Sequence, residues 1–284
     1  MKDVKNNWIF ENSAKKSNFN LNFREIYQYR DLLMLFIRRD IVSVYKQTIL
    51  GPLWYFISPL LASYTQYWVF GRIAEFPSDG APYFLFVLSG NILWSYFSAS
   101  LTSISNTFNA NQRIFGKVYF PRAIVPLSIS ASNLFQFAIK LVLLFVFIVT
   151  LKWYGKMNSY TLLLPILLIE MALISMGVGM IISSLTTKYR DFAQLMAVAV
   201  GLLMYITPVI YPTSMFLDKL PADKEWMIYA NPLTGIFDVF RVGFLGVGNI
   251  NWTAFGYSTI FACVIYLLGL VVFNKVEKSF MDTI

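Results

Sequence analysis

The sequence contains no histidine and a single cysteine among its 284 residues. Histidine is the commonest general base near neutral pH and the commonest metal ligand, so most familiar hydrolytic mechanisms lack their usual group here. Cys263 has no partner in the chain, which leaves neither an internal disulfide nor a cysteine metal site. We therefore predict no catalytic residue and no metal ligand.

A phosphate-binding loop is also missing. The Gly-Lys pairs at Gly116-Lys117 and Gly155-Lys156 lack both the following hydroxyl residue and the upstream glycine of the G-x-x-x-x-G-K-[ST] pattern. The chain is therefore not expected to hydrolyse ATP by itself.

Charge is scarce as well, since only 13% of the residues are charged and 57% are hydrophobic. About a quarter of the residues of soluble domains are charged. Crossing a bilayer takes about 20 apolar residues. Runs without any charge cover residues 49–71, 80–112, 192–217 and 242–274, and two more contain one charge each, residues 124–151 and 161–185. We predict an all-α integral membrane protein with six transmembrane helices.

The lysines and arginines predict the orientation, because positive residues are retained on the cytoplasmic side. With the N-terminus inside, 16 of the 23 fall in cytoplasmic segments and six in outside loops. Both termini are thus expected in the cytoplasm, without a cleavable signal. The net charge of +8 is interpreted as a topology signal, not as nucleic-acid binding. The predicted organisation is a cytoplasmic segment 1–48, a six-span domain 49–274 and a cytoplasmic tail 275–284.

Residues 22–48 differ from a span. Asn22 with Glu25 forms a capping box, and apolar residues then recur at helical spacing. Arg38, Arg39 and Lys46 project from the other side, which predicts an amphipathic helix at the inner leaflet. It serves either as a surface anchor or as a functional element.

The stretch from Pro212 to Trp252 is too long for a tight turn and too interrupted for a span. Residues 233–245 are mostly apolar, and Asp238 and Arg241 stand three apart, where they can pair. We predict short re-entrant helices between spans five and six. An ordinary outside loop is the alternative.

Two ionisable residues lie inside predicted spans, Lys140 and Glu170, each roughly 14 to 17 Å deep. An unpaired charge at that depth is costly, so mutual pairing is expected, and a place on a translocation path is the alternative. Two such charges are too few for a proton relay.

Aromatic residues make up 18% of the chain, and several lie in the middle of spans. A ring face can stack on the apolar face of a sugar while a hydroxyl exchanges hydrogen bonds. The channel candidates are Tyr64, Tyr67, Tyr96 and Tyr205. Helix packing explains each of them equally well.

Five motifs then occur in a recognisable order. They are RDIVSVYKQTILGPLW at 39–54, KVYFPR at 117–122, YRD at 189–191, TPVIYP at 207–212 and NPL at 231–233. Together they resemble the ABC-2 permeases that export O-antigen and teichoic-acid polysaccharides, over nearly the whole chain.

The resemblance implies a homodimer in the bacterial cytoplasmic (inner) membrane, joined to two copies of an ATPase subunit that binds ATP and Mg. The substrate would be a glycan on undecaprenyl diphosphate, and this chain would bind no cofactor. A coupling helix would lie within residues 109–121, and an outer gate within residues 212–248. The implied coupling residues are Asn111, Gln112, Arg113, Ile114, Phe115, Tyr189, Arg190 and Asp191. The implied gate residues are Pro208, Tyr211, Pro212, Asn231 and Pro232.

Several alternatives stay open. The basic residues Arg38, Arg39 and Lys46 suit a lipid diphosphate, anionic headgroups or the ATPase. The whole chain could instead export drugs or small lipids. A membrane-embedded glycosyl- or acyltransferase would need a cluster of acids or bases, but Asp31, Asp40 and Asp191 each adjoin an arginine. A structural scaffold is a further alternative. O-antigen and teichoic-acid export share these motifs.

Overall fold

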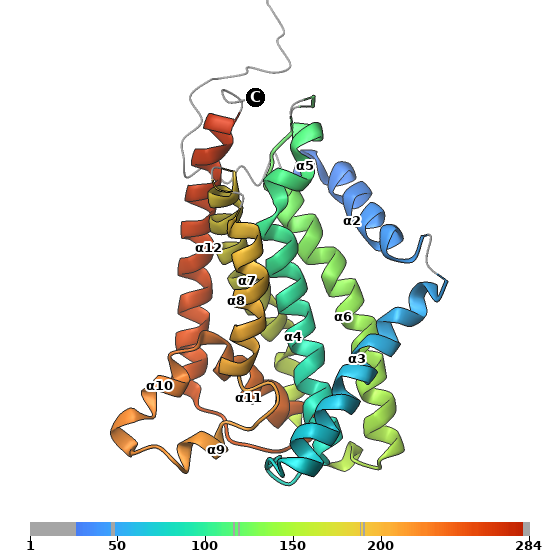
Figure 1. The fold of residues 1–284 in the computed structure, drawn as a ribbon, viewed down its shortest axis with the longest axis vertical. Coiled ribbons are helices and arrows are strands. Elements are labelled where there is room, and N and C mark those ends of the chain that lie inside the picture. Colours follow the sequence, from blue (N-terminus) through green and yellow to red (C-terminus); the bar gives the residue numbers. More distant parts are fainter. Residues whose placement is uncertain are drawn as a thin grey trace, which may run out of the picture.

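A computed structural model describes residues 27–46, 49–115, 117–118, 120–187, 189 and 191–280. Within these ranges every regular element is a helix. Figure 1 shows a bundle of long helices with short helices gathered at its two ends. Helices α2 and α5 and the last turns of α12 mark one end, and α9, α10 and α11 mark the other. We call these the α5 end and the α11 end.

Four helical runs are long and apolar enough to cross a membrane. They are α4 (Tyr83–Ser105), α6 (Ile124–Thr150), α7 (Leu164–Thr186) with the preceding 3-10 helix η4 (Ser159–Leu163), and α12 (Trp252–Phe280). Two shorter runs lie beside them, α8 (Phe192–Ile206) and α3 (Trp54–Gln66), which the π-helix η2 (Tyr67–Ile73) prolongs. The all-helical membrane fold is confirmed, whereas the count of six spans stays a prediction.

Helix α4 lies at the centre of the bundle. In its apolar window 78% of the residues are buried, against 28% in α6 and 22% in α12. It packs against both α6 and α7, and those two helices contact each other much less. The outer faces of α6 and α12 therefore expose apolar side chains that suit a lipid environment.

The most extensive helix contact joins α7 and α12. A Cβ atom added to Gly177 of α7 would lie 2.5 Å from the carbonyl oxygen of Ile265 in α12. A Cβ on Gly269 of α12 would clash with the carbonyl oxygen of Gly177. Small residues at a crossing let two membrane helices approach to backbone contact, and both glycines serve that purpose here.

Two predicted span limits are wrong. The uncharged run 80–112 holds two helices, because α4 ends at Ser105 and α5 (Thr107–Phe115) begins after Asn106. The run 242–274 also crosses a boundary, since α11 (Pro232–Leu245) ends at Gly246, whose φ of +66° favours glycine. An uncharged run indicates that a segment is compatible with lipid, but it does not predict where a helix ends.

The predicted interface helix corresponds to α2 (Arg30–Tyr45). Asn22 and Glu25, the predicted capping box, lie outside the described residues. Phe36 is the buried anchor of α2, and its ring packs edge-on against Phe120 with 5.7 Å between centroids. The main packing partner of α2 is α6, and Figure 1 shows it slanting away from the bundle.

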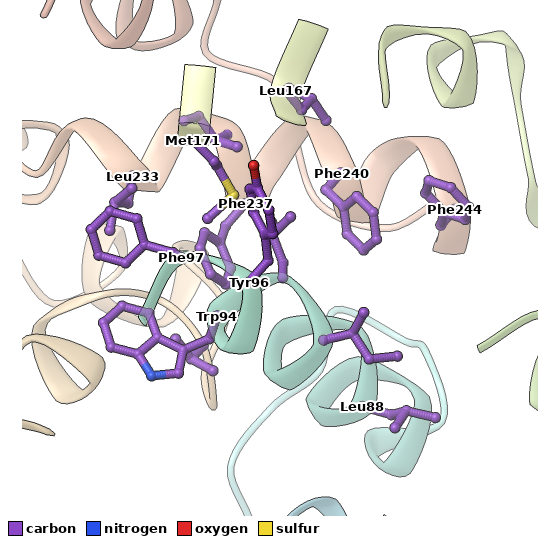
Figure 2. Close-up of a cluster of buried hydrophobic side chains, with 14 of the residues drawn as sticks. Leu88, Trp94, Tyr96, Phe97, Leu167, Met171, Leu233, Phe237, Phe240 and Phe244 are labelled. Atoms are coloured by element: carbon purple, nitrogen blue, oxygen red, sulfur yellow. The ribbon is translucent and has the colours of Figure 1, made fainter. Parts of the chain in front are cut away.

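The segment between α8 and α12 contains α9 (Ser214–Leu217), the 3-10 helix η5 (Ala222–Lys224), α10 (Trp226–Tyr229) and α11. Helix α11 carries standard end signals: the Asn231 side chain accepts from Leu233 N, Pro232 opens the helix and Gly246 closes it. Nearly all of its side chains are buried, and Figure 2 shows Phe237, Phe240 and Phe244 among side chains of α4 and α7.

Candidate functional site

Residues 207–213, which follow α8, are held in place by hydrogen bonds to side chains of other elements. We call them the post-α8 segment. The fastening hydrogen bonds are Tyr83 Oη to Ile210 O (2.9 Å), Asn231 Nδ2 to Thr207 Oγ1 (2.9 Å), Arg241 Nη2 to Val209 O (2.7 Å) and Thr213 Oγ1 to Asp238 Oδ1 (2.6 Å). Three of these four bonds join the segment to α11 or to its N-cap, so α11 and the segment form one unit.

The predicted pairing of Asp238 with Arg241 is wrong, because both side chains have other partners. Asp238 accepts from Thr213, while Arg241 donates to main-chain carbonyls and lies over the Phe86 ring at 3.7 Å. Helical spacing places two side chains on one face, but it does not say what a neighbouring loop offers them.

The predicted gate residues fall on or next to the post-α8 segment. Pro208 and Pro212 are buried and Tyr211 is half-buried, with its hydroxyl donating to Tyr205 O at 2.7 Å. Asn231 caps α11 and holds Thr207 at the same time, and Pro232 follows as the first helical residue. The structure thus gathers these five residues at the α11 end.

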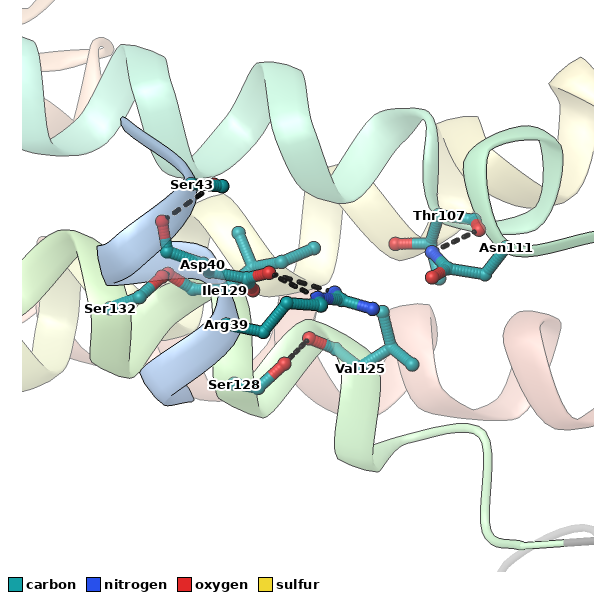
Figure 3. A network of polar contacts seen from close by, with 9 residues as sticks. All are labelled: Arg39, Asp40, Ser43, Thr107, Asn111, Val125, Ser128, Ile129 and Ser132. Atoms are coloured by element: carbon teal, nitrogen blue, oxygen red, sulfur yellow. Dashed lines mark hydrogen bonds and ion pairs between the residues drawn. The ribbon is translucent and has the colours of Figure 1, made fainter. Parts of the chain in front are cut away.

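At the α5 end, a cavity of about 620 Å³ lies between α2, α4, α5, α6 and the start of α8. Its lining is mostly hydroxyl and amide groups, among them Ser103, Asn111, Ser132, Asn133 and Gln136. Figure 3 shows how Arg39, Asp40 and Ser43 of α2 face α6 across this region. A polar cavity at the end of an apolar bundle can accept a hydrophilic group that lipid would exclude.

The three predicted basic residues do not share one environment. Arg39 forms a hydrogen bond and an ion pair with Asp40, both at 2.8 Å, and lies over the Phe36 ring. Arg38 and Lys46 are exposed. A phosphate group reaching α2 would thus meet Arg39 already partnered by a carboxylate.

The residues predicted for coupling lie at the α5 end. Helix α5 buries Asn111 and Phe115, half-buries Ile114, and exposes Gln112 and Arg113. Tyr189 and Asp191 are exposed beyond α7, and Arg190 lies outside the described residues. The exposed members form a surface that a cytoplasmic partner could contact.

Lys140 and Glu170 do not pair in the structure. Lys140 Nζ donates to Ser95 Oγ of α4 at 2.9 Å, and Glu170 Oε1 accepts from Thr259 of α12. The correction has a topological reason. Depth along the chain places both charges at the same level, but α4 stands between their two helices.

The four channel candidates are separated by the fold. Tyr96 is buried, hydrogen-bonded to Ser130 and edge-on to Phe137, so it packs within the subunit. Tyr67 is half-buried and contacts Phe84. Tyr64 of α3 and Tyr205 of α8 are exposed, at 55% and 61%.

Sequence reasoning missed the polar lining of the α5-end cavity and the role of Tyr83. Ser132, Asn133 and Gln136 form a polar stripe within an apolar span, a signal that could have been read from helical spacing. Tyr83 gives no such signal, because its partner Ile210 is far away in sequence.

The described residues thus form a helical membrane protein with several membrane-length helices, a polar cavity at one end and a hydrogen-bonded loop at the other. A family model for ABC-2 type transporters matches residues 31–245. The chain belongs to this family.

Curated relatives align over most of the chain. It is 30% identical to an O-antigen export system permease protein RfbA of Klebsiella pneumoniae, over 89% of this chain and 94% of the relative. It is 22% identical to a capsule polysaccharide export inner-membrane protein BexB of Haemophilus influenzae, over 86% and 90%. It is 20% identical to the polysialic acid transport protein KpsM of Escherichia coli, over 86% and 93%.

Proposed function

We propose that this chain is the membrane-spanning subunit of an ABC exporter that carries a polysaccharide across the bacterial cytoplasmic membrane. The carrying observation is the near full-length alignment with permeases of O-antigen and capsule export. The exported glycan is linked to undecaprenyl diphosphate, and a separate ATPase subunit binds ATP and Mg. The chain itself carries out no covalent chemistry.

In this proposal the chain crosses the membrane six times, with α3 and α8 as the two shorter crossings and the α5 end in the cytoplasm. Helix α11 re-enters the outer half of the membrane. The packing of α11 supports this placement. Phe237 and Phe240 belong to the same hydrophobic cluster as Phe97 of α4. Phe97 lies about 21 Å along α4, counted from the start of that helix at the α11 end. A surface loop would not reach that far into the bundle.

The α5-end cavity then receives the hydrophilic part of the substrate next to the inner leaflet. Arg38 and Lys46 attract the diphosphate. Arg39 binds it in exchange for its ion pair with Asp40. The serine and amide groups of the cavity offer hydrogen bonds to the first sugars.

Two copies of this chain join two copies of the ATPase. The exposed side chains Gln112, Arg113, Tyr189 and Asp191 contact the ATPase. Tyr64 and Tyr205 are exposed on the single subunit, and in the homodimer they line the glycan path between the copies.

The proposal is tested by reconstituting the chain with its ATPase in liposomes and measuring movement of a lipid-diphosphate-linked glycan. We expect ATP-dependent movement that requires both subunits. Gln136→Leu, which makes the cavity lining apolar, should reduce the rate several-fold while both subunits still copurify. The control is Gln194→Leu, an exposed glutamine of α8 outside the cavity lining, which should retain the rate. ATP-dependent movement of small lipids or drugs without glycan movement would contradict the proposal and favour that other class of exporter.

A further inference from the structure

A pocket of about 390 Å³ lies at the α11 end, where the post-α8 segment and α9 meet four further segments. Asp79 comes from the loop before α4, Tyr229 from α10, Asp238 and Arg241 from α11, and Asn249 from the loop before α12. We call it the α11-end pocket. It shares no lining residue with the α5-end cavity, so it is a separate site.

Two buried polar atoms of this pocket have no hydrogen-bond partner among the described residues. Asp238 is 8% exposed, and its Oδ2 is unpaired while Thr213 occupies Oδ1. Arg241 is 3% exposed, and its Nε is unpaired while Nη2 holds Val209 O. Buried polar groups are nearly always satisfied in folded proteins. Asp238 and Arg241 both line the pocket, so the unpaired acceptor and donor can be satisfied by water or by a ligand that both donates and accepts.

Both unpaired atoms are held in place by bonds that do not depend on a ligand. The Thr213 hydroxyl fixes the Asp238 carboxylate, and the Phe86 ring and the Val209 carbonyl fix the Arg241 guanidinium. Asp79 at the rim is likewise fixed, because its Oδ1 accepts from Ser214 at 2.6 Å. A site of this kind loses little side-chain entropy when it binds.

The charges of the pocket decide the class of ligand. An anion would meet the carboxylates of Asp79 and Asp238, and a cation would meet the guanidinium of Arg241. A neutral sugar avoids both conflicts, because each hydroxyl group is at once a donor and an acceptor. Neighbouring hydroxyls can donate to Asp238 Oδ2 and accept from Arg241 Nε, while Tyr229 and Val247 offer apolar contact to the C–H face.

We propose that the α11-end pocket binds one neutral sugar residue through two hydroxyl groups, held by Asp238 and Arg241. The pocket is then the last holding point for the glycan on the outer side, which rests on the function proposed above. A sugar seated there would contact α11 and lie next to the post-α8 segment, so the state of the exit would depend on whether a glycan occupies it.

The test measures binding of methyl glycosides to the full chain in lipid nanodiscs by saturation-transfer NMR. The probes are methyl α-mannoside, methyl α-glucoside and methyl β-galactoside, with glucuronate and glucosamine as charged comparators. We expect saturable binding of at least one neutral glycoside and weaker binding of both charged sugars. Asp238→Asn replaces the unpaired carboxylate oxygen of this lining residue with an amide donor and should weaken binding about tenfold or more. The matched control is Asp218→Asn, an exposed acid outside the pocket, which should bind as the wild type does.

Asn249→Trp provides a second variant that does not disturb the buried pair, because Asn249 is exposed at the pocket. It should abolish binding while leaving the melting temperature unchanged, and it replaces Asp238→Asn if that variant fails to fold. Absence of saturable binding, preference for glucuronate or glucosamine, or unchanged affinity in Asn249→Trp would each overturn the inference. Glycan export without glycoside binding would overturn only this inference, whereas glycoside binding without export would overturn the proposed function.

Discussion

At the scale of single residues, several charged side chains find hydrogen-bond partners on other elements. Lys140 reaches Ser95 on α4, Glu170 reaches Thr259 on α12, and Arg241 reaches Val209 beyond α8. Each bond gives a buried polar group a partner that is distant in sequence. A charged side chain in an apolar stretch thus bonds to a neutral polar group on whichever element packs against it, and not to the nearest opposite charge.

The separate partners of Lys140 and Glu170 lead to a prediction about stability. Lys140→Met removes the hydrogen bond to Ser95 and should lower the free energy of unfolding by about 1.5 to 3 kcal/mol, the range for hydrogen bonds to charged groups. Glu170→Gln keeps an acceptor for Thr259 but removes its charge, so it should lower the free energy of unfolding by about 1 kcal/mol. Their effects should add within about 0.5 kcal/mol in the double variant, because they share no partner. Thermal unfolding of the four proteins in one detergent measures this. Rescue of Glu170→Gln by Lys140→Met would show that the two charges pair after all.

Residue types and helical spacing were enough to single out Lys140, Glu170, Asp238 and Arg241 as charges within apolar stretches, but not to name their partners. Spacing along one helix gives the angle and depth of a side chain. The partner depends on which helices pack against each other. Here α4 lies between α6 and α7, and a hydropathy profile contains no information about that arrangement.

At the scale of elements, the crossing of α7 and α12 is the tightest contact between two long helices. Gly177 and Gly269 bring the backbones together, so these helices form one rigid pair. Helix α8 differs sharply, since Val200 is its only buried residue. Rearrangement during transport is therefore expected at α8 and the segment after it, and not within the α7–α12 pair.

The crossing can be tested with one pair of glycine variants. Gly177→Ala should lower stability by about 1 to 3 kcal/mol, because its methyl group meets the backbone of Ile265. Gly201→Ala in α8 meets open space and should leave stability unchanged or raise it slightly. Melting temperatures measured side by side give the comparison. Equal effects of the two variants would mean that the close approach of α7 and α12 carries no packing constraint.

Elements were predicted well where the sequence carries a local signal. Helix α11 matches the apolar stretch 233–245, where short helices were predicted, and it begins one residue earlier, at Pro232. Helix α3 was expected as part of one continuous span, but it passes into the π-helix at Tyr67, where Arg72 Nε donates back to the Tyr67 hydroxyl. Hydropathy is the same on both sides of that change, so no window average could detect it.

At the scale of the whole molecule, the chain carries polar sites at opposite ends of an apolar bundle. The α5-end cavity and the α11-end pocket have different lining residues, and the bundle between them is filled by the aromatic core around α4. In a single copy this core blocks a direct route. A polymer that enters at one end and leaves at the other would therefore travel along the outside of this core, and in the proposed homodimer this route lies next to the second copy.

The number of crossings makes a testable prediction. In a Cys263→Ser background, Asp218→Cys should react with a membrane-impermeant maleimide added outside intact cells whose outer barrier has been opened. Gln112→Cys should react only after the cytoplasmic membrane is permeabilised, because α6, α7 and α8 lie between the two sites. Labelling of both cysteines from the same side would mean that α8 does not cross, and the count of six would be wrong.

The bond between Arg241 and the post-α8 segment has an evolutionary consequence. Arg241 holds Val209 and Tyr211 through their carbonyl oxygens, which every amino acid provides. Side chains at those two positions can therefore change among relatives that carry different glycans without loosening the attachment. Arg241 itself has no such freedom, since lysine lacks the planar guanidinium that lies over the Phe86 ring while two separate nitrogens donate to the two carbonyls.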